Sequence, residues 1–239
     1  MNNATPRNPK ISHLDTNNLN GPLIAVASRL PEKRAVESRE AEVLAEVYQD
    51  DVNITTWQRT LSPEILNAAQ RLISADHLFR ISTPVTPENA FDSIYDSLGS
   101  NDDAKLISDD VTDIVAMFCC LFELEEVGLR LTTLDRAMCP KFHVDRVPCR
   151  LVTTYSGIAT EWLQHKVVDR SKLGVGSKGK TDAESGLYGD HSDIQKLAAG
   201  DVALLKGESW LGNEGAGLVH RSPQLANQDK RLLLTLDFI

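Results

Sequence analysis

The sequence has few of the features that mark secreted or membrane proteins. Its 239 residues include only four cysteines, and Cys119 and Cys120 are adjacent within an apolar run. Four cysteines in a chain of this size do not make the disulfide framework of small secreted domains. No apolar stretch approaches the roughly 20 residues that span a bilayer, and the polar N-terminus lacks the apolar core of a signal peptide. We therefore expect a cytoplasmic protein with no membrane partner.

Basic residues are also too few for a nucleic-acid-binding surface. The chain contains 25 Lys and Arg against 34 Asp and Glu, a net charge of −9, whereas nucleic-acid binding requires a basic face. Hydrophobic residues make up 41% of the chain, which is typical of a globular protein with a packed core. We expect no nucleic-acid partner, and the composition indicates neither another partner nor an oligomeric state.

Local patterns divide the chain into three regions. Residues 1–20 are polar and rich in Asn, and we expect them to be disordered. Residues 21–127 are mainly helical in pattern, with helical segments at 39–49, 62–75, 86–98 and 109–128 and a short strand or extended segment at 50–59. Residues 128–239 contain segments rich in Val, Leu and Thr that are typical of strands, at 129–135, 141–147, 150–156, 201–207 and 231–238.

These regions predict one integrated domain of the α+β class. An N-terminal helical layer would pack on a C-terminal β-sandwich or small barrel. The stretch from about 170 to 195 is rich in Gly, Ser and Lys, and a loop of this length is usually a mobile lid or a disordered segment.

A His-x-Asp pair lies in the predicted strand 141–147. On a strand, residues i and i+2 project from the same face, with Cα atoms about 7 Å apart, so His143 and Asp145 could reach one metal ion. A hydrogen-bonded surface pair is the other interpretation of this short motif.

A third ligand is available further along the chain. His220 ends a predicted strand that follows a Gly-rich loop, and it could also be a buried structural histidine. Two His and one carboxylate on one face of a metal form the facial triad of non-haem Fe(II) oxygenases. Cys139, four residues before His143, is either a fourth ligand or a small neighbour of the site.

A basic residue opens the last predicted strand, where it could bind a carboxylate. Lys230 and Arg231 compete for this place, and strand alternation puts them on opposite faces. Arg231 shares its face with Leu233, Thr235 and Asp237, a mixed lining that suits a polar pocket. We therefore select Arg231, whose guanidinium binds carboxylates through two hydrogen bonds.

The order of these segments resembles the 2-oxoglutarate- and Fe(II)-dependent oxygenase superfamily, in particular its prolyl-hydroxylase-like members. The resemblance covers residues 128–239: His-x-Asp, "RLVTTYSG", "GDVALL", the second His and the basic residue. The chain is also similar to an uncharacterised bacterial protein family with "CP-x-FH-x-D", "TEWL" and "HRSP" segments.

The resemblance implies a function and a set of site residues. His143, Asp145 and His220 would bind Fe(II), Arg231 would bind the distal carboxylate of 2-oxoglutarate, and Tyr155 would hydrogen-bond the same group. The implied fold is a double-stranded β-helix, a jelly-roll or cupin-like barrel. The protein would be a dioxygenase that hydroxylates an unknown substrate, either a small molecule or a protein side chain.

Two other functions remain open from the sequence. A zinc-binding protein could use Cys139, His143, Asp145 and His220, because a thiolate with imidazoles favours zinc. A non-catalytic cupin-like module would keep the barrel without its metal. For Arg150 and Arg221 we expect salt bridges with nearby acidic residues.

Overall fold

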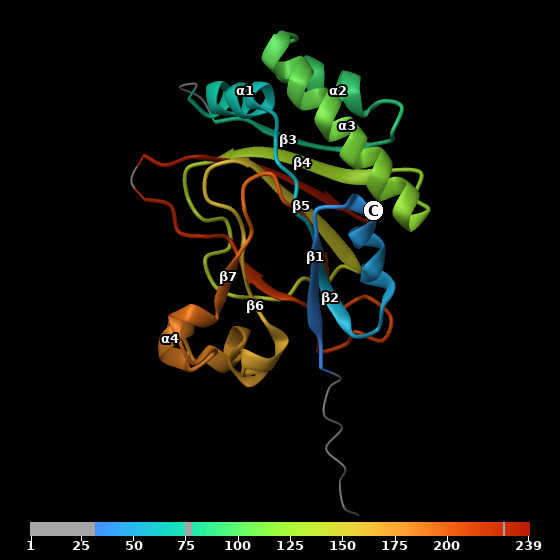
Figure 1. Ribbon diagram of the computed structural model, residues 1–239. Helices are drawn as coiled ribbons and strands as arrows, with labels where there is room; N and C mark the ends of the chain where they lie inside the picture. Colours follow the sequence, from blue (N-terminus) through green and yellow to red (C-terminus); the bar gives the residue numbers. More distant parts are fainter. Residues whose placement is uncertain (1–31, 75–77, 227) are drawn as a thin grey trace, which may run out of the picture.

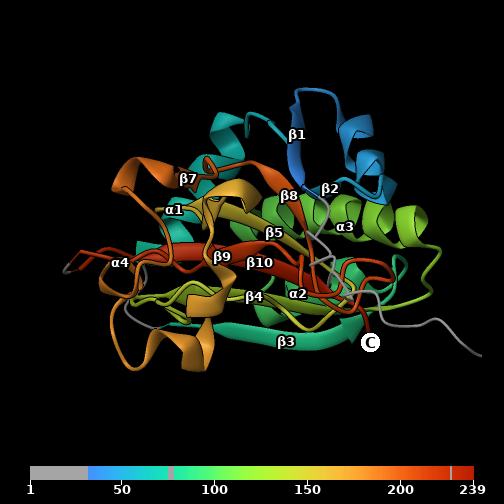
Figure 2. The same cartoon turned by 90° about the horizontal axis from the view of Figure 1, so that it is seen from below.

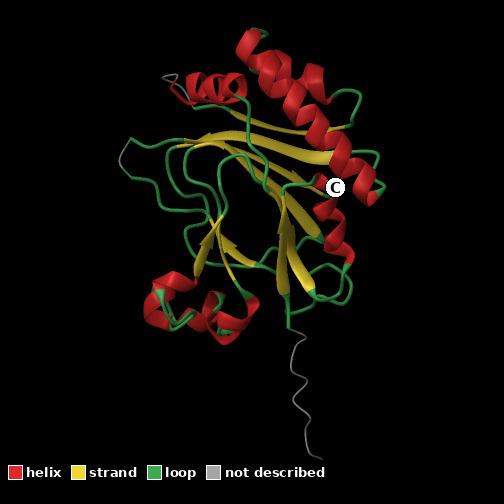
Figure 3. Cartoon of the chain, viewed as in Figure 1, coloured by secondary structure: helices red, strands yellow, loops and turns green. Residues whose placement is uncertain are grey.

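The computed structural model describes residues 32–74, 78–226 and 228–239 (Figure 1). The segment predicted to be disordered, residues 1–20, lies outside the described residues. The fold is mixed α+β: helices cover one face of a large sheet, and a small sheet lies over its other face (Figures 1 and 3). No helix in the described part of the chain is long and apolar enough to cross a membrane.

The large sheet has seven strands, in the spatial order β1-β2-β8-β5-β10-β4-β3. Only β1 and β2 pair in parallel, and every other neighbouring pair is antiparallel. In chain order the strands are β1 (Arg34–Ser38), β2 (Val52–Trp57), β3 (Arg80–Val85), β4 (Val127–Leu134), β5 (Cys149–Ser156), β8 (Val202–Lys206) and β10 (Arg231–Asp237).

The small sheet has three antiparallel strands in the order β7-β6-β9. They are β6 (Glu161–Leu163), β7 (Ile194–Lys196) and β9 (Val219–Arg221). In the described part of the chain, no strand is shared between the two sheets, so they do not close into one continuous barrel. Figure 2 shows the small sheet and the segments around it stacked against the large sheet.

The main helices are α1 (Pro63–Ser74), α2 (Ala90–Ser97) and α3 (Asp102–Phe122), and they pack on the outer face of the large sheet. The 3-10 helix η1 (Ala41–Tyr48) contacts β2 and β8. Asn101 caps α3 by accepting a hydrogen bond from the backbone N–H of Ala104 at 2.9 Å.

Alternation along the strands separates the hydrophobic core into layers. Leu232, Leu234 and Leu236 of β10 are buried in the cluster between the helices and the large sheet. Val152 of β5 belongs to a second cluster, between the two sheets. The face of the large sheet that carries Val152 is therefore the one that can form a site.

The structure differs from the predicted elements in several places. The segment 141–147 is not a regular strand: His143 forms one isolated bridge, and Asp145 accepts a backbone hydrogen bond from Glu208 instead of continuing a ladder. Strands β1 and β3 lie in the region predicted to be mainly helical. Both are edge strands, and β3 contains Pro84, which is tolerated only at an edge. Helix α2 begins at Ala90 rather than Pro87, because Asn89 closes a turn onto the N–H of Thr86.

The Gly/Ser/Lys-rich segment is also more structured than predicted. It contains the short helices η3 (Arg170–Lys172), η4 (Gly174–Ser177), α4 (Asp182–Ser185) and η5 (His191–Asp193), and η2 (His165–Val167) precedes it. Leu187 and Tyr188 are buried against Phe142 and Leu163 in a third apolar cluster. This cluster attaches the segment to the small sheet.

Candidate metal centre

The backbone brings His143 and His220 side by side. Their N–H and C=O groups exchange two hydrogen bonds, each 3.0 Å long, as in a hydrogen-bonded pair of antiparallel strands. Side chains of such a pair project from the same face, and the two imidazole rings lie with centroids 4.6 Å apart. One isolated bridge is therefore enough to place both imidazoles on the same face, without the regular strand predicted for 141–147.

Asp145 completes the cluster. Its Oδ1 is 3.8 Å from His143 Nε2, and its Oδ2 is 3.4 Å from His220 Nε2. One ligand atom from each of the three residues lies within 4.8 Å of the others. In the described residues, this is the one group of at least three His, Cys, Asp or Glu with that property. The structure thus brings together all three residues that the sequence predicts as metal ligands.

Hydrogen bonds to backbone carbonyls fix both imidazoles in the orientation that a metal requires. His143 Nδ1 is 3.0 Å from the carbonyl oxygen of Lys141, and His220 Nδ1 is 3.2 Å from that of Leu218. A carbonyl oxygen only accepts, so Nδ1 carries the proton in both rings. The lone pair of each Nε2 therefore points toward Asp145 and is available for a metal.

The third ligand is held as a carboxylate. Burial favours the neutral acid, but interactions with His220, Arg150 and His143 outweigh it and lower the pKa of Asp145 to about 2. Arg150 donates to Asp145 Oδ2 at 2.7 Å and holds both oxygens of Asp237 at 2.6 and 3.0 Å. Burial, with the nearby His220, lowers the pKa of His143. Two neutral imidazoles and one carboxylate fit a divalent metal.

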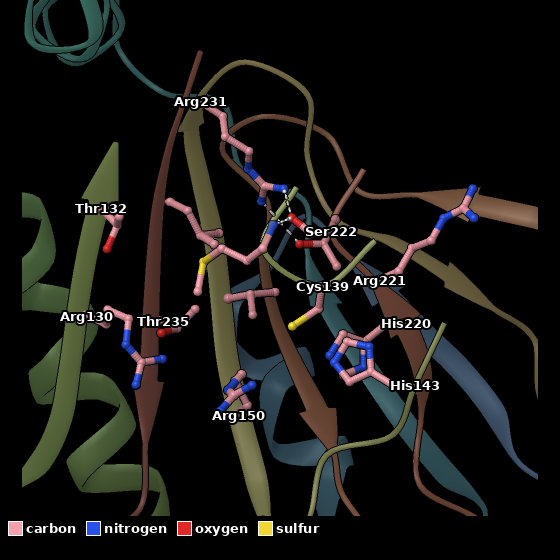
Figure 4. Close-up of a pocket in the computed structure, with 14 residues that line it drawn as sticks. Arg130, Thr132, Cys139, His143, Arg150, His220, Arg221, Ser222, Arg231 and Thr235 are labelled. Carbon is pink, nitrogen blue, oxygen red and sulfur yellow. Dashed lines mark hydrogen bonds between the residues drawn. The ribbon is translucent and has the colours of Figure 1, made fainter. Parts of the chain in front are cut away.

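The cluster opens into a pocket between the two sheets (Figure 4). The lining comes from alternate residues of β4, β10 and β5, from β9 and from the loop that carries His143. The polar and apolar lining residues are Arg130, Thr132, Met138, Cys139, His143, Arg150, Val152, Thr160, His220, Arg221, Ser222, Arg231, Leu233 and Thr235.

Arg231 lies at the far end of this pocket and is fully buried. Its guanidinium donates to hydroxyl oxygens: to Thr154 at 3.2 Å, and to Thr160 and Ser222 at 3.4 Å each. Its Nε is buried without a partner, and it forms no salt bridge within the described residues. Burial lowers the pKa of Arg231 to about 10. A buried cation without a carboxylate partner is costly, so this end of the pocket suits an anionic ligand.

Tyr155, predicted to contact the cosubstrate, lies on the other face of the sheet. Its hydroxyl donates to Asp110 of α3 at 2.5 Å, on the helical side of the molecule. The prediction of its role is therefore wrong: successive residues of a strand alternate, and Thr154 faces Arg231 instead. Thr154, Thr160 and Ser222 were not predicted, because single hydroxyl residues have no distinctive spacing.

The structure also places Cys139, Arg150 and Arg221 relative to the metal ligands. Cys139 is exposed and lines the pocket, but its sulfur is outside the cluster of ligand atoms. Arg221 donates to Glu161 at 2.7 Å and to Asp182 at 3.3 Å. The salt bridges predicted for Arg150 and Arg221 are thus present.

The fold is similar to that of solved oxygenase structures, at low sequence identity. A dioxygenase for auxin oxidation from rice aligns with 87% of this chain and 83% of its own, with a TM-score of 0.50 and 10% sequence identity. A prolyl-4-hydroxylase from Pseudomonas putida aligns with 84% of this chain and 99% of its own, with a TM-score of 0.43 and 11% identity.

Sequence comparison gives the family directly. Residues 38–237 match the family described as "Protein of unknown function (DUF1826)", and the chain belongs to this family. No curated protein matches the sequence.

Proposed function

We propose that this protein is an Fe(II)- and 2-oxoglutarate-dependent dioxygenase that hydroxylates a C–H bond of its substrate. In this proposal the two facing sheets correspond to the double-stranded β-helix of such enzymes. The observation that carries the proposal is one pocket with two complementary ends. At one end His143, Asp145 and His220 present three metal ligands, and at the other the buried guanidinium of Arg231 has only hydroxyl partners.

These two ends suit a metal and an anionic chelating cosubstrate. His143 Nε2, His220 Nε2 and one oxygen of Asp145 would hold Fe(II) and leave coordination positions open toward the pocket. Arg231 would bind the distal carboxylate of 2-oxoglutarate and regain the charged partner that it lacks among the described residues. Thr154, the threonine next to Tyr155, would orient the guanidinium.

The chain's own residues set the conditions for catalysis. Lys141 and Leu218 fix the imidazole tautomers through their carbonyls, and Arg150 orients Asp145. With Fe(II) bound, O₂ would supply one oxygen atom to the substrate C–H bond and the other to 2-oxoglutarate, which would become succinate and CO₂. The fold shared with the rice dioxygenase supports this class of reaction.

The geometry favours Fe(II) over a four-ligand zinc site. Cys139 was the proposed fourth zinc ligand, and its sulfur is not close enough to join the cluster. Three ligands on one side of the metal, with a pocket on the other, are the arrangement of a catalytic site rather than a closed structural site. The triad and the unpaired Arg231 give no reason to prefer a non-catalytic module.

The test is an anaerobic titration of the metal-free protein with Fe(II), with and without 2-oxoglutarate. Chelation of Fe(II) by 2-oxoglutarate should produce a weak charge-transfer band in the visible spectrum. Arg231→Gln should retain Fe(II) and require much more 2-oxoglutarate for the band, whereas His220→Ala should lose both. Absence of the band in the wild-type protein loaded with Fe(II) and 2-oxoglutarate would overturn the proposal.

A further inference from the structure

The pocket has a second cationic position, distinct from Arg231. Arg231 and Thr235 lie on the same face of β10, four residues and about 13 Å apart along the strand. In the sheet, Thr235 is paired with Arg130 of β4, and Leu233 with Thr132. Figure 4 shows Arg130, Thr132 and Thr235 grouped across the pocket from the two histidines, and away from Arg231.

Arg130 is the least paired of the arginines at the metal end. Its Nη1 is 3.9 Å from Asp237 Oδ2, which is beyond hydrogen-bonding distance. Both oxygens of Asp237 are already bound by Arg150, at 2.6 and 3.0 Å. Arg130 Nε is buried without a partner among the described residues, while its side chain is 31% exposed. Arg130 therefore lines the pocket with only a long ion pair to Asp237 and no hydrogen bond to it.

Two unpaired hydroxyl groups accompany this guanidinium. Thr132 Oγ1 and Thr235 Oγ1 are buried, and neither has a hydrogen-bond partner in the described structure. Both residues are on the strand faces that line the pocket. Buried polar groups normally have hydrogen-bond partners. A guanidinium beside two hydroxyl groups without partners therefore predicts that an anionic group of a ligand accepts hydrogen bonds from them. A carboxylate has about four acceptor positions and pairs with the planar guanidinium through two hydrogen bonds.

Apolar side chains also line the pocket that holds this group and the metal ligands. Val152, Leu233 and Met138 line the same pocket. A ligand that reached from Arg130 toward the triad would contact these side chains along its length. We propose that the substrate is a small carboxylic acid with an apolar body, whose carboxylate is bound by Arg130, Thr132 and Thr235. Arg130 is then a specificity-determining residue. This inference rests on the proposed oxygenase function, because that function assigns Arg231 to 2-oxoglutarate.

The test compares matched acids and amides. The full chain is loaded anaerobically with Mn(II) and saturated with 2-oxoglutarate, and benzoate, benzamide, hexanoate and hexanamide are titrated by calorimetry. The acids should bind at least about tenfold more tightly than the amides, the size expected for a charge-assisted pair. Arg130→Gln should abolish this preference and leave the affinity for 2-oxoglutarate within twofold. Arg71→Gln is the matched control, because Arg71 pairs with Asp103 on the helical side of the sheet, and it should change neither.

Three results would overturn the inference. Acids and amides could bind alike, Arg130→Gln could keep the preference for acids, or the acids could be lost in Arg231→Gln and kept in Arg130→Gln. The last result would place the probes in the 2-oxoglutarate position. If Arg130→Gln does not fold, the double variant Thr132→Val, Thr235→Val replaces it, with the same expected loss. A failure of 2-oxoglutarate to bind the Mn(II)-loaded wild type would contradict the oxygenase proposal instead, and it is measured before any acid is added.

Discussion

Thr154 and Tyr155 are neighbours on β5, and their hydroxyls contact groups on opposite faces of the large sheet. The Thr154 hydroxyl accepts from Arg231 Nη2 at 3.2 Å, in the pocket. The Tyr155 hydroxyl donates to Asp110 Oδ2 at 2.5 Å, on the side of α3. Burial and the Asp110 carboxylate raise the pKa of Tyr155, which keeps the hydroxyl protonated and able to donate. One hydroxyl is therefore placed to orient a cosubstrate-binding arginine, and the other attaches a helix.

Substitution of these two neighbours should separate binding from stability. Tyr155→Phe removes a buried hydrogen bond to a carboxylate and should lower the free energy of unfolding by about 1.5–3 kcal/mol. The affinity for 2-oxoglutarate should stay the same. Thr154→Val keeps the shape but removes an acceptor of Arg231, and it should weaken 2-oxoglutarate binding several-fold. Urea denaturation and calorimetric titration of the Mn(II)-loaded protein measure the two quantities.

The reverse result would support the contact with 2-oxoglutarate that the sequence predicts for Tyr155. If Tyr155→Phe weakened 2-oxoglutarate binding and Thr154→Val did not, β5 would have to present its other face to the pocket. Stability serves as the internal control, since Thr154→Val should change the free energy of unfolding less than Tyr155→Phe does.

The sequence predicts the chemical groups of the site better than their geometry. His143, Asp145 and His220 could be found because metal ligation restricts both residue type and order along the chain. Arg231 could be selected over Lys230 from the alternation along β10, even though the pairing of β10 with β5 shifts register between Leu232 and Leu233. The same reasoning fails for Tyr155, since no sequence feature fixes which face of β5 is turned to the pocket.

Features that depend on contacts between distant segments could not be predicted. The His143–His220 bridge joins residues 77 positions apart, and its hydrogen bonds replace the regular strand expected at 141–147. Strand β1 is short and at an edge, so it lacks the continuous apolar pattern of a central strand. The long contact of Arg130 with Asp237 likewise depends on Arg150 binding both oxygens of Asp237, which only the folded structure determines.

Arg150 should control metal affinity through Asp145. It joins Asp145 to Asp237, whose side chain is only 14% exposed. Arg150→Gln removes this bridge, so Asp145 loses its orientation and two partly buried carboxylates lose their cation. We expect a 10- to 100-fold loss of metal affinity, about the effect of removing a group that orients a ligand. Competition with a chromophoric chelator measures it.

Arg59 provides a matched control for this substitution. It forms a bidentate salt bridge with Asp110 at 2.7 and 2.9 Å on the helical side of the sheet. Arg59→Gln should destabilise the fold. The metal affinity of the folded variant should equal that of the folded wild type. Equal losses of affinity in both variants would mean that Arg150 acts only through stability.

Metal binding should weaken at acidic pH because of the imidazoles and not because of the carboxylate. The pKa of Asp145, about 2, keeps it ionised above that pH. Burial lowers the pKa of His143 below the usual 6.5, so its neutral form persists to a lower pH than in a free histidine. Metal affinity should therefore be constant near neutral pH and fall at acidic pH, as protons compete for the imidazoles. An affinity that stayed constant to about pH 5 and fell near pH 4, the usual range of a carboxyl group, would contradict the assignment to histidine.

Lys206, which is not part of the metal site, should make the free energy of unfolding depend on pH in the alkaline range. Its side chain is buried, it donates to the carbonyl of Gln49 at 2.9 Å and it lies 4.8 Å from the centre of the Trp210 ring. Burial, with the nearby charge of Lys33, lowers the pKa of Lys206 from 10.5 to about 8. Between these values the unfolded chain binds more protons at this site than the folded protein does. The free energy of unfolding therefore gains a contribution that rises with pH over this range.

The difference between wild type and Lys206→Met isolates this contribution, because all other titrating groups are common to both proteins. From about pH 8 to pH 10, wild type should become more stable relative to the variant, by up to about 1.4 kcal/mol per pH unit. Below about pH 8 the difference should level off, since the amine is then protonated in both states. Urea denaturation across this range measures it. A constant difference would show that the amine keeps its ordinary pKa, so that Gln49 and Trp210 compensate for its burial.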